Sequence, residues 1–167
     1  MASMIKRILF ATDLSINSSY ALEHAANLAS MTGARLNLLH VVEPMSDEAR
    51  VTIQIFVQNE KDRNEALKSR AEHAKGVLKE RMKQFWDALP ADQVDAIRAQ
   101  IDHTEVFEGH PEEQILKKSK DWDCDLIVIG AHNHGVTQTF LGNVAKRVLR
   151  RARIPTLVVP YVARGER

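Results

Sequence analysis

The residues best suited to bind a ligand lie in a polar loop near the C-terminus. The loop runs from Gly130 to Val144 and has the sequence GAHNHGVTQTFLGNV. Because glycine has no side chain, Gly130 and Gly142 would let a ligand approach the backbone closely. Gly142 also precedes an expected helix, whose first N–H groups and dipole favour an anion such as phosphate. Asn143 would either cap that helix or donate to a phosphate oxygen, although loops with two glycines are often only turns.

Three further residues lie at the end of the first apolar segment of the chain. Ala11, Thr12 and Asp13 close the stretch KRILFATD, in which ILF is typical of a strand that is buried on both faces. Asp13 has two interpretations: it belongs to a binding site, or it only ends the strand and caps the next helix. Ser15 is predicted to be the N-cap of that helix.

Other groupings of reactive residues are weaker. His132 and His134, with His110, would suggest a metal site, but histidines in loops are more often solvated. A Ser-His-Asp triad is not supported, because the strained nucleophile motif is missing. Cys124 is the only cysteine and adjoins an apolar run, which indicates a buried, inert thiol. We therefore predict no catalytic residue and no metal ligand in the protein.

The elements that must position these groups alternate between strand and helix. Short apolar runs predict strands at residues 6–12, 36–42, 126–129 and 156–159, and a further strand is predicted at residues 101–107, before Gly109. Apolar residues at helical spacing predict helices between them, with one helix ending at Gly33 and a long one over residues 67–89 that stops at Pro90. A third helix begins at Pro111, and a fourth is stopped by Pro155.

The predicted fold class is α/β, with a three-layer doubly wound parallel sheet. Strands joined by helices pair in parallel through right-handed crossovers. In such sheets, ligands bind at the carboxyl ends of the strands, where the strand order reverses. Residues 11–13 and residues 130–144 both follow strand ends, so we expect them to meet in one site.

The connection between the second and third strands is longer than one crossover requires. Residues 51–57, VTIQIFV, alternate with a period closer to that of a strand than to that of a helix. Residues 44–65 are therefore interpreted as an insertion or arm, and residues 51–57 as an arm, a lid, a partner surface or the start of the long helix.

Composition and charge limit the classes of function. The 167 residues include 23 Lys and Arg against 22 Asp and Glu, so no global field favours nucleic acid. The basic face over residues 146–153 is either solvated or attracts phosphate or an acidic partner. No apolar stretch approaches the roughly 20 residues of a membrane span, and the N-terminus is not typical of a signal peptide. We expect one domain over residues 1–167, a cytoplasmic location, and neither nucleic-acid nor membrane partners.

Several stretches in the right order resemble the universal stress protein (UspA-like) family. They are ILFATDLS, LHVVE, GHPEEQI, DCDLIVIGAH and FLGNVAKRVLRRARIPTLVVP, and the resemblance covers about residues 5–160. It implies a five-stranded parallel sheet of order 3-2-1-4-5, Rossmann-like and similar to the adenine nucleotide α-hydrolases. It also implies a homodimer that often pairs through the last strand, here Thr156–Val159.

Many members of this family bind ATP through the motif G-x2-G-x9-G-[S/T]. Gly130 and Gly142 match its first and last glycines. Asn133 stands in place of the middle glycine and Asn143 in place of Ser or Thr, and the loop is one residue shorter than the motif.

The resemblance also implies roles for individual residues. Asp13 would contact the nucleoside by accepting hydrogen bonds from the ribose, and the backbone of Val41 would face the adenine. His132, Asn133 and Asn143 would donate to phosphates, and Mg²⁺ would accompany ATP. The implied binding residues are Ala11, Thr12, Asp13, Val41, Ile129, Gly130, His132, Asn133, Gly142, Asn143 and Val144.

Three functions remain open at this stage. The first is an ATP-binding module that acts in stress response or signalling through a homodimer. The second is a family member without nucleotide that acts as a protein-interaction dimer. The third is a slow ATPase, for which His132 or His134 would be the only obvious base in the loop.

Overall fold

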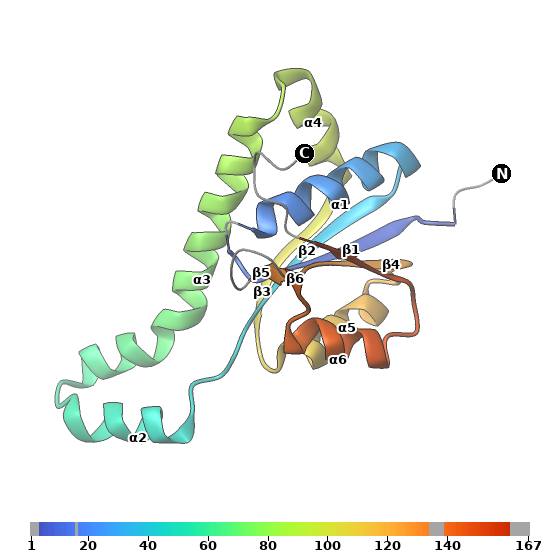
Figure 1. Cartoon of the computed structure of the whole chain (residues 1–167). Helices are drawn as coiled ribbons and strands as arrows, with labels where there is room; N and C mark the ends of the chain where they lie inside the picture. The colour runs from blue at the N-terminus through green and yellow to red at the C-terminus, as the bar shows by residue number, and fades with distance from the viewer. Residues whose placement is uncertain (1–3, 16, 134–138, 161–167) are drawn as a thin grey trace.

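Five parallel strands form the central sheet of the computed structural model, which describes residues 4–15, 17–133 and 139–160 (Figure 1). The strand order is β3-β2-β1-β4-β7, which confirms the predicted order 3-2-1-4-5 and the α/β class. The strands are β1 (Arg7–Thr12), β2 (Arg35–Val42), β3 (Ile101–Glu108), β4 (Leu126–Gly130) and β7 (Thr156–Val159).

Helices cover both faces of this sheet, as the apolar runs require. Alternate residues of β1 face opposite layers: Ile8 packs in a core under the helices α1 and α4, and Leu9 packs in a second core under α5 and α6. All these layers are visible in Figure 1. The helices are α1 (Ser18–Thr32), α3 (Glu60–Ala88), α4 (Ala91–Gln100), α5 (Pro111–Asp121) and α6 (Asn143–Arg151).

The first helix begins later than the sequence predicted. Ser15 is not its N-cap: Asn17 takes that position, and α1 starts at Ser18. The reason is a tight turn after β1, in which Leu14 has a φ of +64° and Ser15 bonds to Asp13. The other end of the helix agrees with the prediction, because Gly33 is the left-handed C-cap with a φ of +70°.

The interpretation of residues 51–57 as strand-like is wrong. They belong mostly to α2 (Asp47–Phe56), in which none of the described residues is buried. Ser46 caps this helix by accepting from the Ala49 N–H at 3.2 Å, and its acidic first turn suits the helix dipole. An alternating segment becomes a strand only where a sheet edge can pair with it, and this one lies away from the sheet (Figure 1).

Three helices, the short α2 and α4 and the long α3, lie between β2 and β3, where the sequence predicted one helix. The predicted helix over residues 67–89 is the second part of α3, which begins at Glu60 and projects beyond the sheet together with α2 (Figure 1). We call α2 and the first turns of α3, residues 47–66, the arm. Pro90 ends α3 as predicted, but α4, with Ile97 as its buried residue, was not foreseen.

The polar loop after β4 contains a short hairpin. It pairs β5 (His132–Asn133) with β6 (Thr139–Phe140) in antiparallel fashion. Among the described residues, no helix is both long enough and apolar enough to cross a membrane.

Candidate functional site

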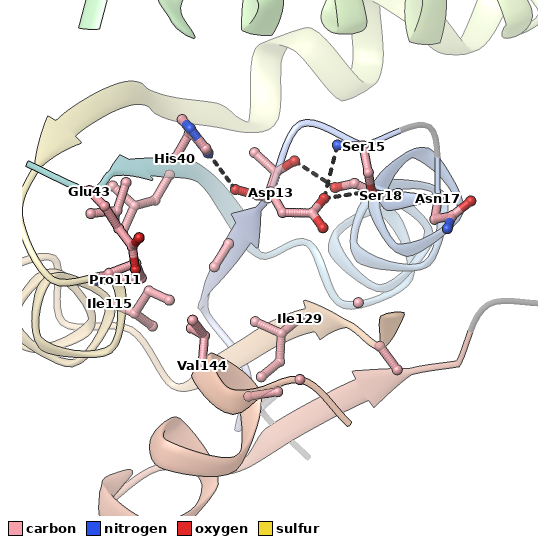
Figure 2. Close-up of a pocket in the computed structure, with 18 residues that line it drawn as sticks. Asp13, Ser15, Asn17, Ser18, His40, Glu43, Pro111, Ile115, Ile129 and Val144 are labelled. Atoms are coloured by element: carbon pink, nitrogen blue, oxygen red, sulfur yellow. Dashed lines mark hydrogen bonds between the residues drawn. The ribbon is translucent and has the colours of Figure 1, made fainter. Parts of the chain in front are cut away.

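One pocket of about 220 Å³ opens at the carboxyl ends of β1, β2 and β4 (Figure 2). Its wall contains the predicted residues Ala11, Thr12, Asp13, Val41, Ile129, Gly130, Gly142 and Val144. The two groups of residues, which are more than a hundred positions apart in the chain, therefore meet as the strand order requires.

Of the other three predicted residues, Asn143 is not among the described residues that line this pocket. Asn143 is the first residue of α6, and Gly142 is the N-cap, so the interpretation of Asn143 as the cap is wrong. His132 and Asn133 are placed only through the backbone of β5, and their side chains lie outside the described part of the chain. His134 lies outside the described residues altogether.

A compact turn holds Asp13 at the mouth of the pocket. The Asp13 Oδ1 atom accepts the backbone N–H of Ser15 at 2.9 Å and the Ser15 hydroxyl at 2.6 Å. These bonds fix the carboxylate beside the end of β1, as Figure 2 shows. A carboxylate has acceptor sites for about four hydrogen bonds, so Asp13 can accept ligand hydroxyls as well.

Hydroxyl groups and an imidazole support the same turn. The hydroxyls of Thr12 and Ser18 bond to one another at 2.5 Å, and the Thr12 Oγ1 atom accepts the N–H of Leu14 at 3.0 Å. The Nδ1 of His40 is 2.7 Å from the carbonyl oxygen of Thr12. Because a carbonyl only accepts, Nδ1 of His40 carries the hydrogen.

Apolar side chains form the part of the wall opposite Asp13. Ile115 of α5, Ile129 of β4 and Val144 of α6 lie there (Figure 2). The backbone of β2 passes along the same pocket at Val41. This combination of an apolar surface, strand backbone and the Asp13 carboxylate suits a flat, partly polar ring joined to a hydroxylated group.

The phosphate-binding features predicted for the loop are present at two places. Gly142 is the N-cap of α6 and has no side-chain cap bond, so the first N–H groups of that helix lack intrahelical partners. At Gly130, a Cβ atom would lie 3.5 Å from the Cβ of Ala21, which is an ordinary contact. The glycine at this position is therefore not demanded by the packing of the protein itself.

The charges on the pocket wall are acidic. Among the described lining residues, the charged side chains are those of Asp13 and Glu43, and no Lys or Arg is present. The sequence from residue 130 to residue 143 also contains neither Lys nor Arg. A ligand phosphate would thus depend on backbone N–H groups, amide side chains, histidine or a cation that arrives with it.

Sequence reasoning missed several lining residues. They are Ser15 as a pocket residue, Asn17, Ser18, Leu39, His40, Glu43, Pro111, Ile115 and Ala145. His40 could have been found, because it precedes Val41 at the end of the same strand. Ser18 and Ile115 come from helices, and only the packing of α1 and α5 against the sheet brings them to the pocket.

Shifted pKa values are found for Glu112, beside the pocket, and for Cys124, which precedes β4 and so lies at the other end of that strand from the pocket. The pKa of Glu112 lies below its ordinary value. The main cause is a hydrogen bond from the backbone N–H of Glu112 itself, and a second cause is the bond from the Arg147 guanidinium at 2.8 Å, while burial acts in the opposite direction. This ion pair joins α5 to α6 beside the pocket. Burial raises the pKa of the Cys124 thiol to about 12, which agrees with the predicted inert thiol.

Comparison with known proteins gives a consistent family assignment. The profile described as "Universal stress protein family" matches residues 4–160. A "Universal stress protein in QAH/OAS sulfhydrylase 3'region" of Thermus aquaticus is 33% identical over 157 residues, covering 93% of this chain and 99% of that protein.

Solved structures show the same fold. The universal stress protein UspA from Lactobacillus plantarum matches with a TM-score of 0.69 at 21% identity, over 94% of this chain and 99% of that one. A universal stress protein in complex with cAMP matches with a TM-score of 0.60 at 20% identity, over 95% and 98% of the two chains.

Proposed function

The chain belongs to the universal stress protein family, and from this premise we propose that its pocket binds an adenine nucleotide, with ATP and Mg²⁺ as the first ligand to test. The observation that carries the proposal is the meeting of Asp13, the Val41 backbone and the N-terminus of α6 around one pocket. A protein of the same fold in complex with cAMP supports this choice of ligand class.

The chemistry of the wall assigns a place to each part of the nucleotide. The adenine would lie on the apolar surface of Ile129 and Val144, with its edge against the Val41 backbone. The ribose hydroxyls would donate to Asp13. The phosphates would lie against the backbone at Gly130 and the free N–H groups after Gly142, with His132, Asn133 and Asn143 as further donors.

Mg²⁺ fits this pocket only as a companion of the nucleotide. Among the described residues, no group of three or more His, Cys, Asp and Glu side chains could hold a metal ion. Mg²⁺ is commonly held by phosphates, water and one or two carboxylates, and Asp13 and Glu43 are the carboxylates on the wall. The ion would offset the acidic character of the pocket towards a triphosphate.

The second part of the proposal is a homodimer in which nucleotide changes the state of the dimer or of a protein partner in stress response or signalling. Its interface would be β7, Thr156–Val159, which lies at the edge of the described sheet next to β4. Leu157 on this strand is 37% exposed, and pairing of two such edges would satisfy backbone groups and cover it. Leu157→Lys should then halve the mass measured by light scattering, and an unchanged mass would contradict this interface.

The cytoplasmic location and a single domain over residues 1–167 stay predictions.

The alternative function is a protein-interaction dimer that binds no nucleotide. It is favoured by Asn133 in place of a glycine, by the shortened loop and by the lack of Lys and Arg on the described pocket wall. The two functions differ in one measurable quantity, the affinity of the pocket for nucleotide.

The experiment has two stages. Purified protein is first denatured, and any released nucleotide is identified by chromatography. Stripped protein is then titrated with ATP and Mg²⁺ in a calorimeter, where we expect a dissociation constant in the low micromolar range, about −7 to −8 kcal/mol. No released nucleotide and no heat would refute nucleotide binding and favour the interaction dimer.

A matched pair of glycine variants locates the site. Gly142→Val would block the approach of phosphate to the backbone and abolish binding without unfolding the protein. Gly76→Val is the control, because a Cβ atom at Gly76 on α3 has no other heavy atom within 4 Å. Wild-type affinity in Gly142→Val would show that phosphate binds elsewhere.

A further inference from the structure

The turn that carries Asp13 is held from outside the pocket by the long helix α3. The Nε of Arg81 donates to the carbonyl oxygen of Leu14 at 3.1 Å, across 67 positions of the chain. The guanidinium is also held by a second residue of α3, because its Nη1 donates to the Oε1 of Gln84 at 3.1 Å. Arg81 thus connects a helix that does not line the pocket with the residue next to Asp13.

Leu14 is the residue of this turn that most needs support. Its φ of +64° lies in the left-handed region, which leucine rarely adopts because its Cβ then crowds the backbone. Side chains bond to both of its backbone polar groups: Thr12 accepts its N–H, and Arg81 donates to its carbonyl. The conformation of Leu14 fixes the direction in which the chain leaves Asp13, so both bonds bear on where that carboxylate points.

A second cavity lies behind the turn, so the turn separates two cavities. This cavity of about 20 Å³, the space of roughly one water, lies between α3 and the turn, and Leu78, Arg81 and Met82 line it from the side of α3. Thr12, Ser15 and Ser18 line both this cavity and the candidate nucleotide pocket. Because the wall is not packed tightly on its outer side, a polar contact rather than close packing sets its position there.

From these observations we propose that Arg81 is a positioning residue for the pocket, which sets nucleotide affinity by holding the Leu14 turn and so the Asp13 carboxylate. This inference rests on the proposed nucleotide binding. It adds that the position of α3, whose first turns belong to the arm, sets the nucleotide affinity of the pocket although α3 does not line it.

The test compares variants that remove the same charge from the same helix. Arg81→Met keeps much of the aliphatic stem and removes the donor. Lys83→Met is the control, since Lys83 is exposed, lies two residues further along α3, and its loss changes the net charge equally. For Mg²⁺ and ATP, we expect affinity about tenfold weaker in Arg81→Met, which is the loss of one hydrogen bond from a charged donor, and unchanged affinity in Lys83→Met. Arg81→Lys, which restores a charged donor, should recover part of the loss.

A double-mutant cycle separates positioning from general destabilisation. If Arg81 acts through Asp13, Arg81→Met should weaken binding less than twofold when Asp13 has already been replaced by Asn. The same tenfold loss in both backgrounds, or no loss in either, would overturn the proposal.

Amide hydrogen exchange tests the turn without any nucleotide. The N–H groups of Leu14 and Ser15 are bonded within the turn, so their exchange should be at least about tenfold faster in Arg81→Met, while that of Leu39 in the core stays unchanged. Unchanged exchange at Leu14 and Ser15 would refute the role of Arg81. If wild-type protein binds no nucleotide, the proposed function fails, and this measurement still decides whether Arg81 holds the turn.

Discussion

The buried amide of Asn37 offers a quantitative test of how the sheet is held together. Asn37 lies in β2 and is 1% exposed. Its Oδ1 accepts the Nδ1–H of His103 on β3 at 2.6 Å, and its Nδ2 donates to the carbonyl oxygen of Ile8 on β1 at 3.4 Å. His103 is kept in place by stacking on Trp122, with ring centroids 4.7 Å apart and planes within 10°. One amide therefore connects three neighbouring strands.

Asn37→Leu keeps the branching and the number of side-chain heavy atoms and replaces the polar atoms with methyl groups, which are somewhat larger. The loss of a neutral hydrogen bond costs about 1 kcal/mol, and the stranded N–H of His103, a partly buried side chain, adds up to about 3 kcal/mol. Burial of the leucine offsets part of this, so we expect the free energy of unfolding to fall by about 2–3 kcal/mol. At roughly 2–4 °C per kcal/mol for a chain of this length, Tm should drop by about 4–12 °C.

The assay is urea unfolding followed by tryptophan fluorescence, at several protein concentrations so that any change in association is separated from folding. His103→Phe preserves a ring against Trp122 and removes the donor. In that background no donor is stranded, and Asn37→Leu should cost about 1–2 kcal/mol less. An equal cost in both backgrounds, or a cost below about 0.5 kcal/mol in the wild-type background, would refute the reasoning.

Two further predictions concern titratable groups. With a pKa of about 12, about one Cys124 thiol in 10,000 is ionised at pH 8. Iodoacetamide should therefore label the native protein at least about a hundredfold more slowly than the urea-unfolded protein. Similar labelling rates, measured by mass spectrometry, would contradict the burial of this thiol. Because the folded-state pKa of Glu112 lies below its ordinary value of 4.5, its stabilising effect is full above about pH 4.5 and is lost as the pH falls through the folded-state pKa. Glu112→Gln should therefore lower the free energy of unfolding by about 1 kcal/mol at pH 7 and by less at pH 3, and an equal loss at both pH values in urea would show that the charge is not responsible.

The sheet could be predicted because its strands are short, apolar and separated by helices. Residues 126–129, LIVI, and 8–10, ILF, admit few other structures in a chain of this kind, and their strand ends bring Asp13 and Gly130 together. The parallel α/β sheet therefore follows from local sequence and the handedness of crossovers, whereas the strand order 3-2-1-4-5 was implied by the resemblance to the universal stress protein family.

The errors arose where local pattern competed with tertiary context. Residues 51–57 alternate like a strand, but Ser46 starts a helix and no sheet edge is near them. Ser15 has the chemistry of an N-cap, and its Oγ accepts the N–H of Ser18 at 3.3 Å, but the turn at Leu14 leaves it outside the helix, whose N-cap is Asn17. In each case, a contact that the one-dimensional pattern does not contain decided the outcome.

The candidate site was predicted in part for a similar reason. Strand ends and glycines are visible in the sequence, so Asp13, Val41 and Gly142 were identified. Ser18 and Ile115 point to the pocket only after α1 and α5 have packed on the sheet. Arg81 is one of many cationic residues on α3, and nothing in its sequence context marks it as the partner of Leu14.

The central place of β1 has a consequence for the order in which the chain is made. Among the strands of this sheet β1 is synthesised first, yet it pairs with β2 on one side and with β4 on the other. One edge is covered once Val42 has been synthesised, and the other stays open until Gly130 follows, while α1 to α5 are already complete. The pocket therefore cannot close before Gly130 has been synthesised, and a nascent chain that stops before β4 presents an unpaired apolar edge of the kind that promotes aggregation and chaperone binding.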